Sequence, residues 1–131
     1  MCGIVGFYSS RNDKESIIYE QLKTLYHRGP DDQRIYLDKN IAFGHTRLAI
    51  IDINHAQQPM KSFDDRYILI FNGEIYNYLE LRQHLVSKGM KFKTHSDTED
   101  LLNMLSMHVT ILYVCQRMDY MNIMKQYLIL L

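Results

Sequence analysis

The chain has 131 residues, which is the size of a single domain. Its 15 Lys and Arg residues balance 15 Asp and Glu residues, so the overall charge gives no argument for binding nucleic acid or an anionic membrane. With 47% hydrophobic and 23% charged residues, the composition is that of a soluble globular protein and excludes an intrinsically disordered chain.

Cysteine, histidine and apolar residues give no support for a disulfide framework, a metal site or a membrane span. Cys2 and Cys115 are the two cysteines, neither has neighbours at zinc-ligand spacing, and the six histidines are scattered. The N-terminus lacks the features of a signal peptide, and no uncharged apolar stretch approaches the roughly 20 residues that span a bilayer. We therefore expect a cytoplasmic, reducing location, with no metal, nucleic-acid or membrane partner.

All six glycines and both prolines lie before residue 90, which predicts short elements joined by tight turns in that part of the chain. In chain order, the apolar patterns predict a buried strand at 3–8, an amphipathic helix at 15–25, a loop at 27–32, strands at 34–37 and 40–52, and a loop at 53–62. They continue with a buried strand at 67–71, a helix at 78–88 that Gly89 stops, a strand at 91–94, and a helix that Ser96 or Asp97 caps. Several strands with a few packed helices indicate an α+β fold.

Cys2 is the first candidate for catalysis. If Met1 is removed, the Cys2 thiol lies on the N-terminal residue, next to a free α-amino group. Such an amine has an ordinary pKa of about 7.7–8.0, so it can accept a proton near neutral pH. A nucleophile and a base on one residue form the N-terminal nucleophile arrangement. The alternative is that Cys2 is a small buried hydrophobic residue, as most cysteines are.

Asn72 and Gly73 follow the most apolar predicted strand. An Asn side-chain N–H and a Gly backbone N–H can point together at one oxygen, which is what an oxyanion hole requires. The alternative is a hairpin turn, in which Asn-Gly is a preferred pair. The residues that follow, Glu74 to Tyr78, do not alternate between apolar and polar as a second hairpin strand does, and this weakens the hairpin alternative.

Two charged residues are candidates for binding a zwitterionic substrate. Arg47 stands beside the apolar run 48–51 and can bind a carboxylate with two parallel hydrogen bonds; alternatively, it pairs with Asp52 or ends a strand. Asp97 either binds an ammonium group or caps the helix that follows it.

Six motifs occur together in one order: 1–6 (MCGIVG), 27–32 (HRGPDD), 44–52 (GHTRLAIID), 57–60 (QQPM), 71–78 (FNGEIYNY) and 96–99 (SDTE). This set resembles the glutaminase domain of class II (N-terminal nucleophile) glutamine amidotransferases, and within that class the glutamine-hydrolysing asparagine synthetases. The amino-sugar synthase branch shares the Met-Cys-Gly start, but usually has Trp-Ala-Thr-His where this chain has Leu48-Ala49-Ile50-Ile51.

The resemblance implies an N-terminal nucleophile hydrolase fold, a four-layer αββα sandwich of two antiparallel sheets. It implies that Cys2 attacks the side-chain amide of L-glutamine and that Asn72 and Gly73 hold the oxyanion. By the same resemblance, the substrate-binding residues are Arg47 for the α-carboxylate, Asp97 with Glu74 for the α-ammonium group, and Leu48, Ile50 and Ile51 along the pocket. The products are glutamate and ammonia, and the glutaminase reaction needs no cofactor.

The likeness ends near residue 105, so we expect a partial amidotransferase domain at 1–105 and a divergent tail at 106–131. The segment 104–131 holds five of the eight methionines, and its apolar residues recur at three-and-four spacing, which predicts one amphipathic helix that docks on an open sheet edge or a partner. The other explanation, which we favour, is a truncated or frame-shifted gene, and we expect the sandwich to be incomplete at its C-terminal side.

The synthetase half of an asparagine synthetase is not expected in this sequence, because no Ser-Gly-Gly-x-Asp-Ser-like phosphate-binding loop is present. ATP and Mg²⁺ would belong to that half, so amide transfer would need a separate synthetase subunit. Three hypotheses follow: a working glutaminase, a catalytically inactive module that binds glutamine, and a gene remnant without a stable fold.

Overall fold

The computed structural model of the chain describes residues 2–107 and 128–130. Two antiparallel three-stranded sheets, with strand orders β1-β3-β2 and β4-β5-β6, are accompanied by three α-helices. The elements are β1 (Gly3–Tyr8), α1 (Lys14–Leu25), the 3₁₀ turn η1 (Tyr26–Arg28), β2 (Asp32–Leu37), β3 (Ile41–Arg47), β4 (Met60–Lys61), β5 (Ile68–Phe71), α2 (Tyr78–Ser87), α3 (Asp97–Met107) and β6 (Leu128–Leu130). The predicted α+β class is confirmed.

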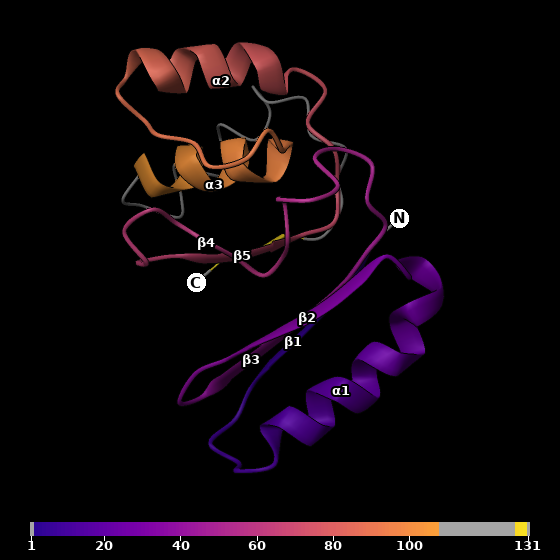
Figure 1. Ribbon diagram of the computed structural model, residues 1–131. Coiled ribbons are helices and arrows are strands. Elements are labelled where there is room, and N and C mark those ends of the chain that lie inside the picture. Colours follow the sequence, from indigo (N-terminus) through magenta and orange to yellow (C-terminus); the bar gives the residue numbers. More distant parts are fainter. Residues whose placement is uncertain (1, 108–127, 131) are drawn as a thin grey trace.

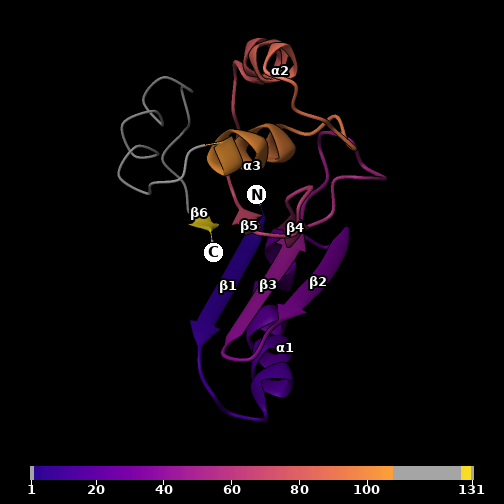
Figure 2. The same ribbon diagram turned by 90° about the vertical axis from the view of Figure 1, so that its left-hand side faces the viewer.

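Helix α1 covers one face of the first sheet, and the second sheet lies on the other face (Figures 1 and 2). The helix buries Ile18 and Leu22 completely, and Leu22 packs on Gly44 of the central strand β3. Because side chains alternate along a strand, the preceding β3 residue, Phe43, faces the second sheet and packs with Ile68 and Ile70 of β5. The alternation therefore builds the contact between the two sheets.

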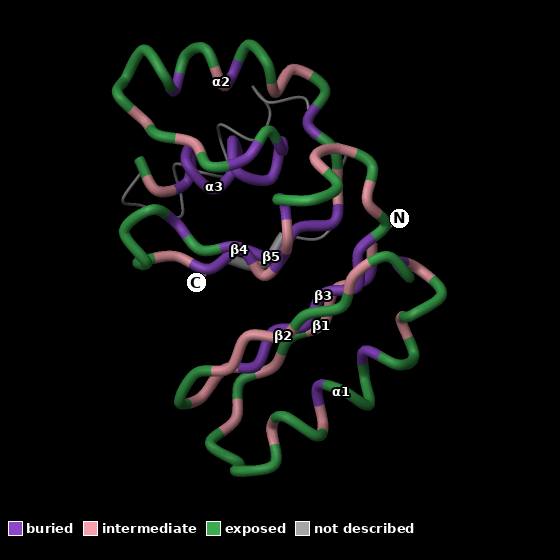
Figure 3. The backbone as a smooth tube through the Cα atoms, viewed as in Figure 1, coloured by how far each residue is buried: buried purple, intermediate pink, exposed green. Residues whose placement is uncertain are grey.

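Helices α3 and α2 lie beyond the second sheet, on the side away from α1 (Figure 1). The larger hydrophobic core is formed there by residues of β5, α2 and α3, including Leu69, Phe71, Leu81, Leu85, Leu101, Leu102 and Leu105. Figure 3 shows this pattern as buried stretches along β5 and α3, with a mostly exposed α2. The alternation of β5 thus divides its side chains between the two hydrophobic clusters.

The structure differs from the predicted elements at three places. The predicted strand at 40–52 is too long, because β3 ends at Arg47 and residues 48–56 form a loop. The strand predicted at 91–94 is wrong: the N–H groups of Lys93 and Thr94 donate to the Glu99 carboxylate instead of to a neighbouring strand. The short strand β4 lies in a segment predicted as loop. The predicted helices match α1, α2 and α3, and Ser96 caps α3 because its Oγ accepts the Glu99 N–H.

The predicted helical tail lies mostly outside the described residues. Helix α3 ends at Met107, and Leu128–Leu130 form a strand that pairs with β5 in the register Leu69↔Leu130 and Phe71↔Leu128. At these three residues the structure therefore has a strand where the spacing predicts a helix. Within the residues that the structure describes, none of the helices is long and apolar enough to span a membrane.

Candidate functional site

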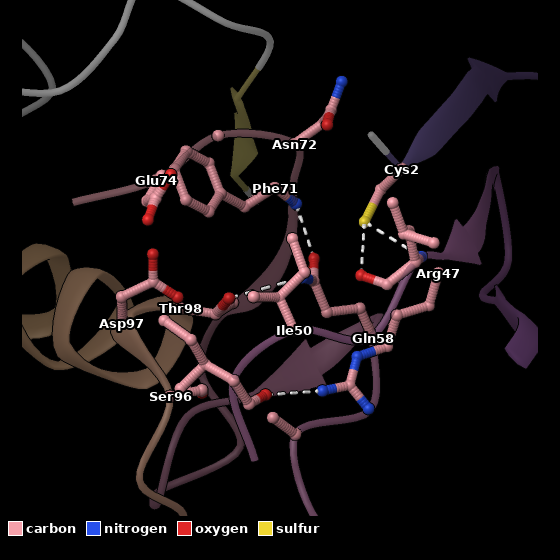
Figure 4. A pocket seen from close by; sticks show the side chains of 14 residues that line it. Cys2, Arg47, Ile50, Gln58, Phe71, Asn72, Glu74, Ser96, Asp97 and Thr98 are labelled. Atoms are coloured by element: carbon pink, nitrogen blue, oxygen red, sulfur yellow. Dashed lines mark hydrogen bonds between the residues drawn. The ribbon is translucent and has the colours of Figure 1, made fainter. Parts of the chain in front are cut away.

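A pocket of about 160 Å³ lies where β1 begins, β3 and β5 end, and α3 begins (Figure 4). All nine residues that we expected from the sequence to be catalytic or substrate-binding line this pocket: Cys2, Arg47, Leu48, Ile50, Ile51, Asn72, Gly73, Glu74 and Asp97. Five more residues, Ala56, Gln58, Phe71, Ser96 and Thr98, complete the lining. Segments separated by up to 96 positions in the sequence therefore meet at one place.

The Cys2 thiol lies on the wall of this pocket, next to the loop that follows β3. Its sulfur accepts the Leu48 N–H over 3.4 Å and lies 3.8 Å from the Leu48 carbonyl oxygen, to which the thiol donates. The next residue, Gly3, begins the β1–β3 ladder opposite Thr46. Cys2 is partly exposed and is not a member of either hydrophobic cluster, so the alternative of a buried hydrophobic cysteine does not describe its surroundings.

The loop at 27–32 holds the backbone of the Cys2 region, a role that the sequence did not predict. Nε of Arg28 donates to the Cys2 carbonyl over 3.0 Å, and Oδ2 of Asp31 accepts the Ala49 N–H over 2.8 Å. Gly29 permits these contacts because a Cβ there would lie 2.5 Å from the Arg47 carbonyl carbon. The glycine of this loop is therefore required by a close approach of two backbone segments.

Asn72 and Gly73 lie directly after β5, and the hairpin alternative is wrong because α2 is the next element along the chain. The Phe71 ring folds over Gly73, where a Cβ would lie 2.5 Å from the ring, so any other residue there would have to displace this buried ring. Asn72 is buried, and in Figure 4 its amide nitrogen is turned away from the Cys2 thiol. Aiming that nitrogen at an oxygen beside Cys2 needs a rotation about the Asn72 side-chain torsions.

Arg47 is buried at the end of β3 and binds the backbone of the following loop. Its Nη1 donates to the Ile53 carbonyl over 2.9 Å, and its Nη2 donates to the carbonyls of Ile51 and Asp52 over 2.8 and 2.9 Å. Arg47 therefore ends a strand, and it contacts Asp52 through the backbone carbonyl. These bonds use three of the five guanidinium N–H groups.

Asp97 and Glu74 supply the negative charge of the pocket, and their side chains face one another in Figure 4. Oδ2 of Asp97 accepts the Ile75 N–H over 3.0 Å. Burial raises the pKa of the Asp97 carboxyl above its ordinary value, and the charge of Glu74 raises it further. A cation between the two carboxylates would favour the charged form of Asp97 and so oppose this rise in its pKa.

Comparisons with known proteins show the family to which the chain belongs. A family model described as a glutamine amidotransferase domain matches residues 1–115. The chain belongs to this family. It is 45% identical over 107 residues to glutamine-hydrolyzing asparagine synthetase 1 of Bacillus subtilis, covering 78% of this chain and 17% of that protein. It is 40% identical over 112 residues to a probable glutamine-hydrolyzing asparagine synthetase of Schizosaccharomyces pombe, covering 82% of this chain and 20% of the other.

The amidotransferase chain thus spans about a fifth of the length of these curated relatives. In the residues that the structure describes, we find no group of three or more His, Cys, Asp or Glu side chains arranged to hold a metal ion. The groups that line the pocket are a thiol, two carboxylates, a guanidinium group, the side-chain amides of Gln58 and Asn72, the hydroxyls of Ser96 and Thr98, and backbone N–H groups.

A buried ion pair positions the segment of the amidotransferase domain that carries Asp97. Arg82 of α2 binds the Asp100 carboxylate with two hydrogen bonds of 3.1 and 2.9 Å, and it also donates to the carbonyls of Thr94 and Ser96. Burial raises the pKa of Asp100 to about 6, although the Arg82 charge opposes the rise. Arg82 therefore joins α2, α3 and the loop between them.

His45 provides a pH-dependent contribution to the stability of the domain. It is 1% exposed, and burial lowers its pKa from 6.5 to about 4. Between these values the unfolded chain binds a proton that the folded chain does not, so this contribution is complete above pH 6.5 and declines as the pH falls. We expect the titration of His45 to lower the free energy of unfolding by about 3 kcal/mol between pH 6.5 and pH 4.

Urea unfolding of the wild type and of His45→Gln at several pH values measures this contribution. The carboxyl groups of Asp97 and Asp100 titrate in both proteins, so the difference between the two pH profiles reports His45. Parallel profiles for the two proteins would show that His45 is not a neutral group with a lowered pKa.

Proposed function

We propose that this amidotransferase domain hydrolyses L-glutamine to glutamate and ammonia, with Cys2 as the nucleophile once Met1 has been removed. The observation that carries the proposal is the meeting of the Cys2 thiol, the Asn72-Gly73 pair and the Asp97 carboxylate in one pocket. Each group matches a charge that glutamine carries or develops during amide hydrolysis.

In the proposed reaction, the Cys2 α-amine accepts the thiol proton, and the sulfur attacks the side-chain amide carbon of glutamine. The carbonyl oxygen becomes an oxyanion, which receives hydrogen bonds from the Gly73 N–H and from the Asn72 amide after its rotation. The α-ammonium group then protonates the leaving nitrogen, so that ammonia departs and a thioester remains. Water attacks the thioester, which releases glutamate and restores the thiol.

The other end of glutamine is proposed to lie between Arg47 and the two carboxylates. The guanidinium group of Arg47 has two N–H groups, on Nε and Nη1, beyond the three that bind the loop carbonyls. Either can donate to the substrate α-carboxylate. Asp97 and Glu74 would hold the α-ammonium group, whose positive charge compensates the two facing carboxylates. The backbone and side chains of Leu48, Ile50 and Ile51 line the same pocket.

We further propose that the domain has an asparagine-synthetase-like role. In this role the ammonia is used by a synthetase part of the protein or by a separate synthetase subunit. ATP and Mg²⁺ would be bound there. We also propose that the chain associates with a second copy of itself through a sheet edge. The order α1, first sheet, second sheet and α3 with α2 supports a four-layer αββα sandwich of the N-terminal nucleophile hydrolases (Figure 1), and a cytoplasmic location remains part of the proposal.

The test is glutamate and ammonia release from glutamine by the purified chain, with an intact mass that shows whether Met1 is absent. Equal amounts of glutamate and ammonia from the processed chain are expected. A processed chain that melts at a higher temperature with glutamine but releases no glutamate would instead be a binding module. A broad, non-cooperative melt would indicate a chain without a stable fold.

Replacing Asp97 by Asn is expected to raise KM for glutamine about 10- to 100-fold, because a hydrogen bond to a charged group contributes about 1.5–3 kcal/mol. The effect on kcat should be smaller, since the α-ammonium group is equally charged in the ground and transition states. Initial rates over a range of glutamine concentrations measure both constants. Glu80→Gln, an exposed change of the same charge on α2, is the control, and an unchanged KM in Asp97→Asn would contradict the assignment.

A further inference from the structure

The backbone of Phe71, directly before Asn72, is held by two side chains from other parts of the chain. The Phe71 N–H donates to Oε1 of Gln58 over 2.6 Å, and the Phe71 carbonyl accepts from Nε2 of His45 over 3.3 Å. The ladder between β4 and β5 contains two residue pairs, and Phe71 is in neither. On the β4 side, side chains therefore bind the Phe71 backbone beyond the point at which β4 begins. We call this pair of contacts the Phe71 clamp.

Gln58 also connects the clamp to the helix that begins at the pocket. Its Nε2 donates to Oγ1 of Thr98 over 3.3 Å (Figure 4), and Thr98 follows Asp97 at the start of α3. Gln58 is 6% exposed, so both ends of its amide are bound within the protein. One side chain thus links the end of β5, where the oxyanion would form, to the helix that would hold the substrate ammonium group.

The contact of His45 with Phe71 leaves the other ring nitrogen of His45 buried, which is unfavourable and which a hydrophobic residue at this position would avoid. Because Nε2 faces a carbonyl oxygen, it must carry the proton, and Nδ1 is then a buried acceptor. Among the described residues Nδ1 has no hydrogen-bond partner. A buried polar atom without a partner is unfavourable, so the Nε2–H contact to Phe71 is the feature that distinguishes histidine from an apolar residue at this position.

We propose that His45 and Gln58 are positioning residues, which fix the Phe71 peptide and thereby aim Asn72 and the Gly73 N–H at the oxyanion. The proposal rests on the proposed glutaminase activity. Since the oxyanion exists in the transition state and not in bound glutamine, loosening the clamp lowers kcat while KM stays nearly constant. A loss of stability alone would reduce the amount of folded protein and would not depend on the donor at position 45.

The test compares His45→Phe, which removes the donor, with His45→Gln, whose side-chain N–H can take the place of Nε2–H. We expect His45→Phe to lower kcat about 10-fold per folded molecule, with KM changed less than about twofold, and His45→Gln to restore most of the loss. Gln58→Met should lower kcat as His45→Phe does. If His45→Phe does not fold, the kcat of Gln58→Met tests the proposal instead. Its matched control is Gln57→Met, because Gln57 binds the Asn54 carbonyl and lies outside the pocket lining.

Wild-type kcat in both His45→Phe and Gln58→Met, or a change in KM alone, would overturn the proposal. Hydrogen exchange of the Phe71 N–H, followed by NMR, reports on the clamp without turnover: Gln58→Met removes the acceptor of this N–H, so exchange should be about 10-fold faster than in Gln57→Met. Equal exchange in these two variants overturns the clamp even if the enzyme is active. A processed wild type without turnover overturns the proposed function and removes the catalytic role of the clamp, whatever the exchange result.

Discussion

Replacing Cys2 by Ala is expected to lower glutamate release by at least about 1,000-fold, because the variant lacks the atom that forms the thioester. The contacts of Cys2 suggest that the chain tolerates the change. Its backbone carbonyl still accepts from Arg28, and the β1–β3 ladder begins at the next residue. The variant should therefore melt close to the wild type while glutamate release, measured with a coupled assay, is lost.

Cys115→Ala is the control for this prediction, since it removes the second thiol of the chain. Cys2→Ser adds a graded result. It keeps a hydroxyl group beside the α-amine, but the hydroxyl is a much weaker nucleophile at neutral pH, so turnover should lie far below that of the wild type. Intact masses must show the same removal of Met1 in all variants. Substantial turnover by processed Cys2→Ala would contradict the assignment of Cys2 as the nucleophile.

The positions of the pocket residues were predictable because they belong to short motifs in a fixed order. Cys2, Asn72 and Asp97 each have a chemical reason to act on glutamine, and the family resemblance assigned them to one site before the structure showed them in one pocket. The helices were predictable for a different reason, since their apolar spacing matches the faces that bury Ile18 and Leu101. Local pattern and long-range packing agree at these places.

Failures of the prediction occur where long-range contacts determine the backbone. The apolar run 48–51 resembles a continuing strand, but Arg47 folds the following loop back by binding its carbonyls, and Asp52 adopts a left-handed φ of 47°. The segment 91–94 likewise alternates as a strand does. Its N–H groups are taken by Glu99 instead. Propensity alone does not reveal such partners.

The supporting residues were missed because their contacts bridge distant positions. Arg28 reaches Cys2 across 26 residues, and His45 reaches Phe71 across 26 residues. Gln58 was visible only as part of the motif 57–60, with no indication that its amide binds the Phe71 N–H. Side chains that touch a substrate are constrained by the chemistry of that substrate, whereas these residues are constrained by the geometry of the fold.

Replacing Asn72 by Ala is expected to lower kcat about 100-fold, which is the usual consequence of removing one donor from an oxyanion hole. KM should change little, since the neutral amide oxygen of bound glutamine gains less from this hydrogen bond than the oxyanion does. Asn72→Asp should be worse than Asn72→Ala, because it places a carboxylate where negative charge develops. Steady-state rates over a range of glutamine concentrations measure these differences.

The comparison of the two Asn72 variants also separates the contributions of Asn72 and Gly73. In Asn72→Ala the Gly73 N–H is retained, so residual turnover above the level of Cys2→Ala is expected and represents catalysis with a single donor. Asn40→Ala is the matched control, because Asn40 binds the Tyr8 hydroxyl at the surface far from the pocket lining. If Asn72→Ala raised KM and left kcat unchanged, Asn72 would bind glutamine in its ground state. The oxyanion would then depend on Gly73 and on the clamp that holds Phe71.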